Sequence, residues 1–343
     1  MNKKKMIETN ELSPEMKASV KTRVITALVL AALCVPCLFL GGWFFFGLTF
    51  VVIILEAYEL VHILDLKTKF KHIILVASIL ILLAIVFWIF VKNNVSQYVA
   101  TGSLEFSWDN LLINNFNDVI VSTVIIMIAA GVFFGISFIS EEFDVFKVCY
   151  LFAMVIIVGL TMQSVLYLRF SPLHQFAKVD GFDLYSPFFR YCQSAFLLIY
   201  VCLGVFANDI GAFFIGILFG KHKVNPRISP KKTWEGFYGG IAFSFIFSFG
   251  FAMITAALKV PMLPSMDLAH WYWPLVISFI MPIFANLGDF AFSAIKRTFK
   301  VKDFSNLLPG HGGILDRLDS ILFTSGFVAV FLVFVNSNWS IFA

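Results

Sequence analysis

The chain has 343 residues, of which 60% are hydrophobic and only 13% are charged, and its mean hydropathy is +0.90. A soluble domain carries about 25% charged residues, so a soluble core could not hide this many apolar side chains. The composition therefore excludes an ordinary soluble protein and predicts an integral membrane protein. The formal net charge of +4 says little until the positions of the charges are considered.

A helix needs about 20 residues to cross a bilayer, and nine apolar runs come near that length. They lie at 24–40, 43–64, 73–91, 119–139, 148–168, 189–207, 237–258, 272–290 and 320–336. The runs are continuous and do not alternate between apolar and polar residues, which excludes transmembrane strands. We therefore expect an all-α, polytopic membrane protein with about nine transmembrane helices. The apolar stretch 208–220 either extends the sixth span or re-enters the membrane.

The basic residues are unevenly divided between the two predicted sides of the membrane. With a cytoplasmic N-terminus, 20 of the 25 Lys and Arg residues fall on the cytoplasmic side. The predicted outer loops hold the other five, which are Lys92, Arg169, Lys178, Arg190 and Lys259. This asymmetry is the positive-inside pattern, and it supports an odd number of spans.

Three regions follow from this layout. Residues 1–23 form a cytoplasmic N-terminal segment, residues 24–190 form the N-terminal transmembrane helices, and residues 191–343 form a transmembrane region that carries the catalytic residues. We expect catalytic residues there because two segments with cytoplasmic locations, 208–236 and 286–320, are dense in Asp, Lys, Gly, Pro and His.

In the segment 286–320, the eighth span continues into a polar run. If the run is helical, Asp289, Ser293, Lys296 and Lys300 share one face. An acid, a hydroxyl and two ammonium groups would then line one stripe at the membrane boundary. This combination suits a phosphate-bearing ligand, because lysines bind phosphate oxygens.

The same segment continues through Pro309 and three nearby glycines into the ninth span. The glycines predict a tight turn whose backbone amides approach a ligand closely. Asp316 and Asp319 lie three residues apart at the start of the last span, so both carboxylates project from one face. Carboxylates near the bilayer are costly unless they are paired or metal-bound, and hard oxygen ligands suit Mg²⁺.

The segment 208–236 leads to a similar hypothesis. Ser229 and Pro230 are typical of a helix N-cap followed by proline, which would put Lys231 and Lys232 in the first helical turn. Positive charges there oppose the helix dipole unless an anion shares the site, so we predict a phosphate cradle. Asp209, in an apolar run, is a functional candidate by default.

Glu56 and Glu59, in the second span, raise the same question as Asp209. They could line the cavity, pair with a basic residue or lie near the membrane interface.

The polar residues of the C-terminal region follow one long pattern. In order it contains Ser293, Lys296, Arg297, Lys302, Asp303, Pro309, Gly310, His311, Gly312, Gly313, Asp316, Arg317 and Asp319. This pattern resembles the signature of the phosphatidate cytidylyltransferases (CDP-diacylglycerol synthases). The run 229–236 and the pair Asn208 and Asp209 also look like that family. The resemblance covers the C-terminal 40% of the chain well, and the N-terminal half only in its hydrophobic layout.

The resemblance implies that the chain makes CDP-diacylglycerol and pyrophosphate from CTP and phosphatidate, with Mg²⁺ and with room for a second cation. By resemblance the metal ligands are Asp209, Asp289, Asp316 and Asp319. The catalytic residues are Asp289, Asp316, Asp319, Lys296 and Arg297. The substrate-binding residues are Ser229, Lys231, Lys232, Ser293, Lys302, Gly310, His311, Gly312, Gly313 and Arg317.

Two other functions stay open: a polyprenol kinase-like enzyme that uses CTP, and an ion-coupled transporter. The transporter is less favoured because the chain shows no internal repeat, which many transporters contain. The expected partners are CTP, phosphatidate and the lipid bilayer. A homodimer is compatible with the sequence, and no nucleic acid is expected. The short N-terminus favours a bacterial cell (inner) membrane, with the site facing the cytoplasm.

Overall fold

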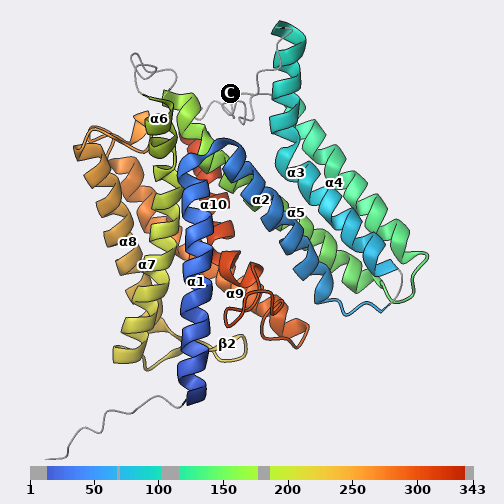
Figure 1. Ribbon diagram of the computed structural model, residues 1–343. Coiled ribbons are helices and arrows are strands. Elements are labelled where there is room, and N and C mark those ends of the chain that lie inside the picture. Colours follow the sequence, from blue (N-terminus) through green and yellow to red (C-terminus); the bar gives the residue numbers. More distant parts are fainter. Residues whose placement is uncertain (1–13, 68–69, 102–115, 177–185, 337–343) are drawn as a thin grey trace, which may run out of the picture.

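The computed structural model describes the whole chain except residues 1–13, 68–69, 102–115, 177–185 and 337–343. Its helices are α1 (Pro14–Leu40), α2 (Gly42–His62), α3 (Phe70–Thr101), α4 (Phe116–Ser137), α5 (Val145–Phe176), α6 (Pro187–Ser194), α7 (Phe196–Phe219), α8 (Trp234–Ala257), α9 (Tyr272–Thr298) and α10 (Leu315–Asn336). A short 3-10 helix, η2 (Pro264–Met266), and an antiparallel hairpin of β1 (Lys223–Asn225) and β2 (Ser229–Thr233) complete the described elements. The predicted all-α class is confirmed (Figure 1).

Within the described residues, eight helical segments are long and apolar enough to cross a membrane. A ninth predicted span corresponds to α4, whose apolar part Val121–Ser137 is shorter. The polytopic membrane fold is therefore confirmed, and each predicted span coincides with a helix. The stretch 208–220 extends the sixth span, because α7 continues to Phe219 and joins α6 in one apolar segment, Phe188–Phe219.

The first helix begins earlier than the sequence predicts. We expected a polar segment over 1–23, whereas α1 starts at Pro14 and its apolar part starts at Lys21. A helix extends past its apolar stretch because long basic side chains at its end reach water. The rest of the predicted segment, 1–13, lies outside the described residues.

Arg169 is completely buried, so the prediction that it lies in an outer polar loop is wrong. The helix α5 continues through it to Phe176. Its guanidinium donates hydrogen bonds to the Leu38 carbonyl (2.8 Å) and the Tyr191 carbonyl (3.2 Å), and it also bonds the Ser194 hydroxyl. These bonds stabilise a buried charge and join α5 to the end of α1 and to α6.

The helices α7 and α8 pack closely along their length because glycines line their contact. A Cβ atom added to Gly211 would lie 2.6 Å from the Phe243 Cβ, and one added to Gly239 would lie 2.4 Å from the Ile215 Cβ. Small residues permit such close approach between membrane helices. The hairpin leaves the end of this pair and lies with the end of α9 toward one end of the bundle (Figure 1).

Candidate active site

The hairpin between α7 and α8 carries Lys231 and Lys232 on β2. The helix α8 begins at Trp234 and not at Pro230, and its N-cap is Thr233, whose side-chain oxygen accepts a hydrogen bond from the Gly236 amide at 3.2 Å. The predicted helix start at Ser229 is therefore wrong, and so is the placement of both lysines in a first helical turn. They lie on a strand that ends at the cap.

The acid in the first turn of α8 explains why the helix starts where it does. Glu235 lies where a negative charge complements the helix dipole, whereas lysines there would oppose it. Its carboxylate accepts hydrogen bonds from the Lys221 amide (3.1 Å) and the His222 amide (3.2 Å), and it contacts the His222 Nδ1 atom (2.6 Å). Glu235 therefore fixes the hairpin to α8 and so fixes the position of Lys231 and Lys232.

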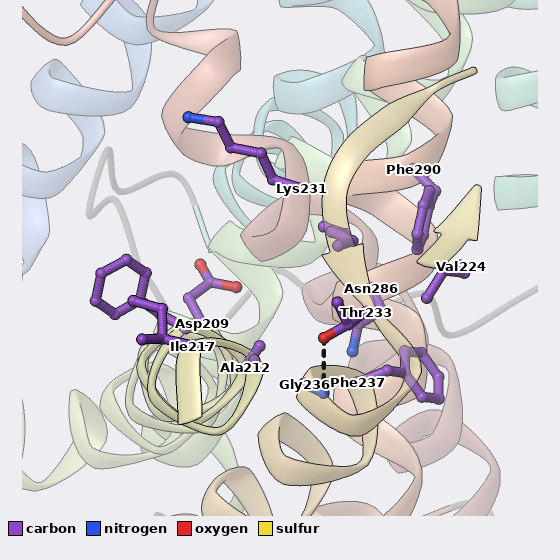
Figure 2. A pocket seen from close by; sticks show the side chains of 13 residues that line it. Asp209, Ala212, Ile217, Val224, Lys231, Thr233, Gly236, Phe237, Asn286 and Phe290 are labelled. Carbon is purple, nitrogen blue, oxygen red and sulfur yellow. Dashed lines mark hydrogen bonds between the residues drawn. The ribbon is translucent and has the colours of Figure 1, made fainter. Parts of the chain in front are cut away.

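A cavity of about 420 Å³ lies between α7, the hairpin, α8 and α9. Its lining consists of Asp209, Ala212, Phe213, Gly216, Ile217, Val224, Lys231, Lys232, Thr233, Gly236, Phe237, Asn286 and Phe290. In Figure 2, Asp209 and Ile217 lie on one side, and Val224 and Phe290 lie on the other. Phe213 and Ile217 are largely exposed on the surface of α7, so the cavity opens beside an apolar, lipid-suited face.

Three carboxylates from three helices lie near one another, and among them Asp209 lines the cavity. Asp209 of α7 and Asp319 of α10 each interact electrostatically with Asp289 of α9 and with one another. Lys232 forms an ion pair with Asp289, and Lys296 lies close enough to Asp319 to interact with it. The structure therefore brings the predicted acids Asp209, Asp289 and Asp319 together with Lys232 and Lys296.

Two asparagines hold Asp209 in place, and one of them, Asn286, is outside the predicted site. The buried Asn286 donates to the Asn208 Oδ1 atom at 3.0 Å and to the Pro282 carbonyl at 2.8 Å. The Asn208 amide in turn lies 3.4 Å from the Asp209 Oδ1 atom. The sequence did contain a signal for Asn286. It lies within the predicted span 272–290, one turn before Asp289, and an amide buried there must find hydrogen-bond partners.

Asp316 contacts protein groups through both of its oxygens. Its Oδ1 atom lies 2.5 Å from the Lys296 Nζ atom, and its Oδ2 atom accepts hydrogen bonds from the Phe304 amide (2.8 Å) and the Gly313 amide (3.0 Å). The loop between α9 and α10 is therefore folded around this carboxylate. Its predicted role as a metal ligand stays a prediction, and these contacts favour a role in positioning the loop.

The predicted glycine turn is present. Gly310 and Gly312 have φ values of 75° and 83°, a left-handed conformation that favours glycine. The amides of His311 and Gly312 donate to the Leu308 carbonyl at 2.8 and 3.1 Å, and the Gly313 amide donates to Asp316. These three amides already have partners within the chain, so their predicted contact with phosphate stays a prediction that the geometry does not favour.

Other predicted residues lie around this cluster of acids and lysines. The Ser293 hydroxyl donates to the Asp289 Oδ1 atom at 3.2 Å, and Arg317 donates to the His311 carbonyl at 2.9 and 2.5 Å. Arg297 donates to the Ile228 carbonyl at 3.4 Å, which joins α9 to the hairpin.

Two lysines and one serine from the prediction make no contact with the acidic cluster that the described structure shows. Lys302 is exposed, and Ser229 lies opposite Asn225 in the hairpin. Lys300 follows the end of α9 with a φ of 56°, so its predicted place on the helical face is wrong.

A comparison with known sequences decides the family. The model of the cytidylyltransferase family matches residues 21–335. The chain belongs to the cytidylyltransferase family. It is 36% identical over 171 residues to the phosphatidate cytidylyltransferase of Bacillus subtilis, which covers 50% of this chain and 56% of that protein. It is 42% identical over 137 residues to the Staphylococcus haemolyticus protein of the same name, covering 40% and 48%. The matches span about half the length of these curated relatives, and the resemblance stated from the motif is confirmed.

The acidic side chains of the candidate site suit a cation that also binds substrate. Within the described residues, no group of three His, Cys, Asp or Glu side chains converges closely enough to hold a metal by itself. Mg²⁺ is commonly bound by one or two carboxylates together with substrate phosphates. The electrostatically coupled carboxylates of Asp209, Asp289 and Asp319 fit that shared arrangement, and they do not fit a protein-only cage.

Proposed function

We propose that this cytidylyltransferase transfers the cytidylyl group of CTP to phosphatidate, giving CDP-diacylglycerol and pyrophosphate. The observation that carries the proposal is the Lys232–Asp289 pair, which lies at a cavity that borders the apolar, exposed face of α7. The relatives' printed name, phosphatidate cytidylyltransferase, supports the same substrates. A lipid phosphate could enter this cavity from the bilayer while a nucleotide enters from the aqueous end.

The chemistry requires two anions to meet. A phosphate oxygen of phosphatidate forms a bond to the α-phosphorus of CTP, and the bond from that phosphorus to the oxygen bridging the β-phosphorus breaks. Phosphatidate is already ionised at neutral pH, so no general base is needed. The main tasks of the protein are to position the two phosphates and to neutralise their charge.

The basic residues divide these tasks by their positions. Lys231 and Lys232 line the cavity, and we assign them to the phosphates that meet there. Lys296 lies between Asp316 and Asp319, where it offsets the acidic cluster and holds the loop. Arg297 contacts the Ile228 carbonyl, so it holds the hairpin against α9.

Asp209, Asp289 and Asp319, together with phosphate oxygens of the substrates, would hold Mg²⁺ and a second cation if one binds. The cation would neutralise the negative charge that develops on the phosphates during transfer. The Asn286–Asn208 contact orients the carboxylate of Asp209 for binding the cation. The Ser293 hydroxyl does the same for Asp289.

The eight long apolar helices in the described part of the chain identify a multi-pass membrane protein. We place the hairpin and the α9–α10 loop in the cytoplasm of a bacterial cell, at the inner membrane, because CTP is made there. The distribution of 20 of the 25 Lys and Arg residues supports that orientation.

The test uses purified protein in detergent micelles with phosphatidate, Mg²⁺ and CTP labelled in its cytosine ring. We expect label to enter the lipid and pyrophosphate to appear in equal amount, and only when phosphatidate is present. Asp289→Asn, which removes the charge paired with Lys232, should lose most of this activity. Release of pyrophosphate without labelled lipid, or equal activity of the variant, would refute the proposal.

A further inference from the structure

Glu59 of α2 contacts the loop between α9 and α10, although its partners are more than 240 residues away in the chain. Its Oε1 atom accepts hydrogen bonds from the Ser305 hydroxyl at 2.6 Å and from the Ile314 amide at 2.7 Å. Its Oε2 atom accepts one from the Leu315 amide at 2.8 Å. The side chain is completely buried. All three partners are donors, so the set fits an ionised carboxylate.

The partners of Glu59 include the first backbone amide of α10, that of Leu315, and the amide of Ile314 just before the helix. These amides have no acceptors within the helix, and a carboxylate beside them is favoured by the helix dipole. Glu59 therefore stabilises the start of α10, which is the turn that carries Asp316. Its bond to Ser305 fixes the preceding loop at the same point. One carboxylate thus holds both ends of the segment that folds around Asp316 and Lys296.

The same contact explains why residue 313 is glycine. A Cβ atom at Gly313 would lie 2.6 Å from both carboxylate oxygens of Glu59, a distance that real Cβ atoms do not adopt. Unlike Gly310 and Gly312, Gly313 does not have a positive φ. The missing side chain at 313 therefore serves the approach of Glu59, whereas the glycines at 310 and 312 serve the backbone turn.

Burial alone does not account for Glu59. Glu56 lies one turn away on α2 and is equally buried, yet neither of its oxygens has a hydrogen-bond partner. The two acids share a helix and are equally buried, and they differ in their hydrogen-bond partners. Glu56 therefore supplies an internal control for the effect of removing a buried carboxylate.

We propose that Glu59 is a positioning residue for the transfer reaction, which it serves by holding the α9–α10 loop and the first turn of α10 so that Asp316 and Lys296 keep their places. The inference rests on the proposed function for its kinetic consequences, and it makes the N-terminal helices part of the active-site architecture. It assigns no contact between Glu59 and substrate.

The first experiment compares Glu59→Gln with Glu56→Gln in the full-length protein. Glutamine keeps the shape but loses one acceptor oxygen, so the amide of either Ile314 or Leu315 is left without its acceptor. We expect kcat to fall about 10- to 100-fold for Glu59→Gln, with KM for CTP changed less than threefold. We expect Glu56→Gln to stay within twofold of the parent. Equal losses in the two variants, or a kcat for Glu59→Gln within twofold of the parent, would overturn the proposal.

The second experiment is a double-mutant cycle, because either acid variant could reduce the folded fraction. Gly313→Ala alone should lower kcat, since its methyl group displaces the Glu59 carboxylate. In a Glu59→Ala background the obstacle is gone, and Gly313→Ala should lower kcat by less than a further twofold. Additive losses would contradict a direct contact. All rates are taken per folded molecule, counted by size-exclusion chromatography.

A third measurement does not depend on activity. Hydrogen–deuterium exchange of peptides covering 303–316 should be faster in Glu59→Gln than in the parent, and unchanged in Glu56→Gln. If the parent makes no CDP-diacylglycerol but this exchange result holds, the proposed function fails while the contact role of Glu59 stands. If exchange over 303–316 is the same in all three proteins, the positioning role fails whatever the activity.

Discussion

Lys296 and Asp316 form an ion pair across the loop between α9 and α10, with 2.5 Å between the Nζ and Oδ1 atoms. Their side chains are only 9% and 4% exposed. Removing one member of a buried pair leaves an uncompensated charge, which typically costs 3–5 kcal/mol, whereas replacing both can be nearly neutral. The pair therefore links stability to the geometry of the site.

Lys296→Met should lower the free energy of unfolding by about 3 kcal/mol, because Asp316 then stays buried without its partner. The double variant Lys296→Met/Asp316→Leu should regain much of that stability and remain inactive. Unfolding in detergent, followed by tryptophan fluorescence, measures both. Lys300→Met, at an exposed position after the helix end, is the matched control. If Lys296→Met were as stable as Lys300→Met, the ion pair would not be formed in the folded protein.

Lys232→Met should reduce turnover strongly with little effect on the melting temperature. The lysine lines the cavity and pairs with Asp289, but it is partly exposed, so the pair adds little to stability. Lys223→Met changes an exposed lysine on the same hairpin that does not line the cavity. Steady-state rates at several CTP and phosphatidate concentrations compare the two. Equal rates in both variants would remove Lys232 from the site.

Thr233→Ala should destabilise the protein by about 1 kcal/mol, the usual effect of losing an N-cap side chain. Ser229→Ala should have almost no effect, because Ser229 lies within β2 and α8 starts later. Thermal melts of the two variants measured side by side decide where the helix begins. A larger loss for Ser229→Ala would restore the helix start that the sequence predicts.

Asn286→Leu should lower turnover by about 10-fold, because Asn208 and then Asp209 lose the side chain that orients them. The exposed Asn306, changed to Ala, serves as the control. The dependence of the rate on Mg²⁺ concentration is the more specific readout. We expect the variant to need more Mg²⁺ for half-maximal rate, and an unchanged requirement would argue against the orienting role of Asn286.

The orientation of the site can be measured by cysteine accessibility. In a variant without its five native cysteines, a single cysteine at Arg227, in the exposed turn of the hairpin, should resist an impermeant thiol reagent in intact cells. One at Leu268, beyond the other end of α8, should react from outside. The reverse labelling pattern would separate the site from cytoplasmic CTP.

The helices were predictable because each apolar run is about long enough to cross a bilayer as a helix. The grouping of Asp289, Ser293 and Lys296 on one face was predictable for the same local reason, since the spacing of a helix fixes which side chains are neighbours. The motif around Asp316 and Asp319 located the site before its geometry was known. These predictions all depend on contacts close in sequence.

The errors concern choices that local sequence leaves open. Ser229 and Thr233 are both good N-caps, and the pairing of β2 with β1 selects the second. Arg169 follows an apolar run, and only the carbonyls of other helices reveal that it is buried. The role of Glu59 depends on partners 246 to 256 residues away, a separation that no local pattern encodes.

The most direct test of the central claim is which phosphorus atom of CTP reaches the lipid. Purified protein, phosphatidate and Mg²⁺ are incubated with CTP labelled either at the α-phosphate or at the γ-phosphate, with Asp289→Asn as the control. Cytidylyl transfer predicts that the α label enters the lipid, that the γ label leaves as pyrophosphate, and that the control transfers little of either. Transfer of the γ label to a lipid would instead identify a CTP-dependent kinase and contradict cytidylyl transfer at the cavity beside Lys232 and Asp289.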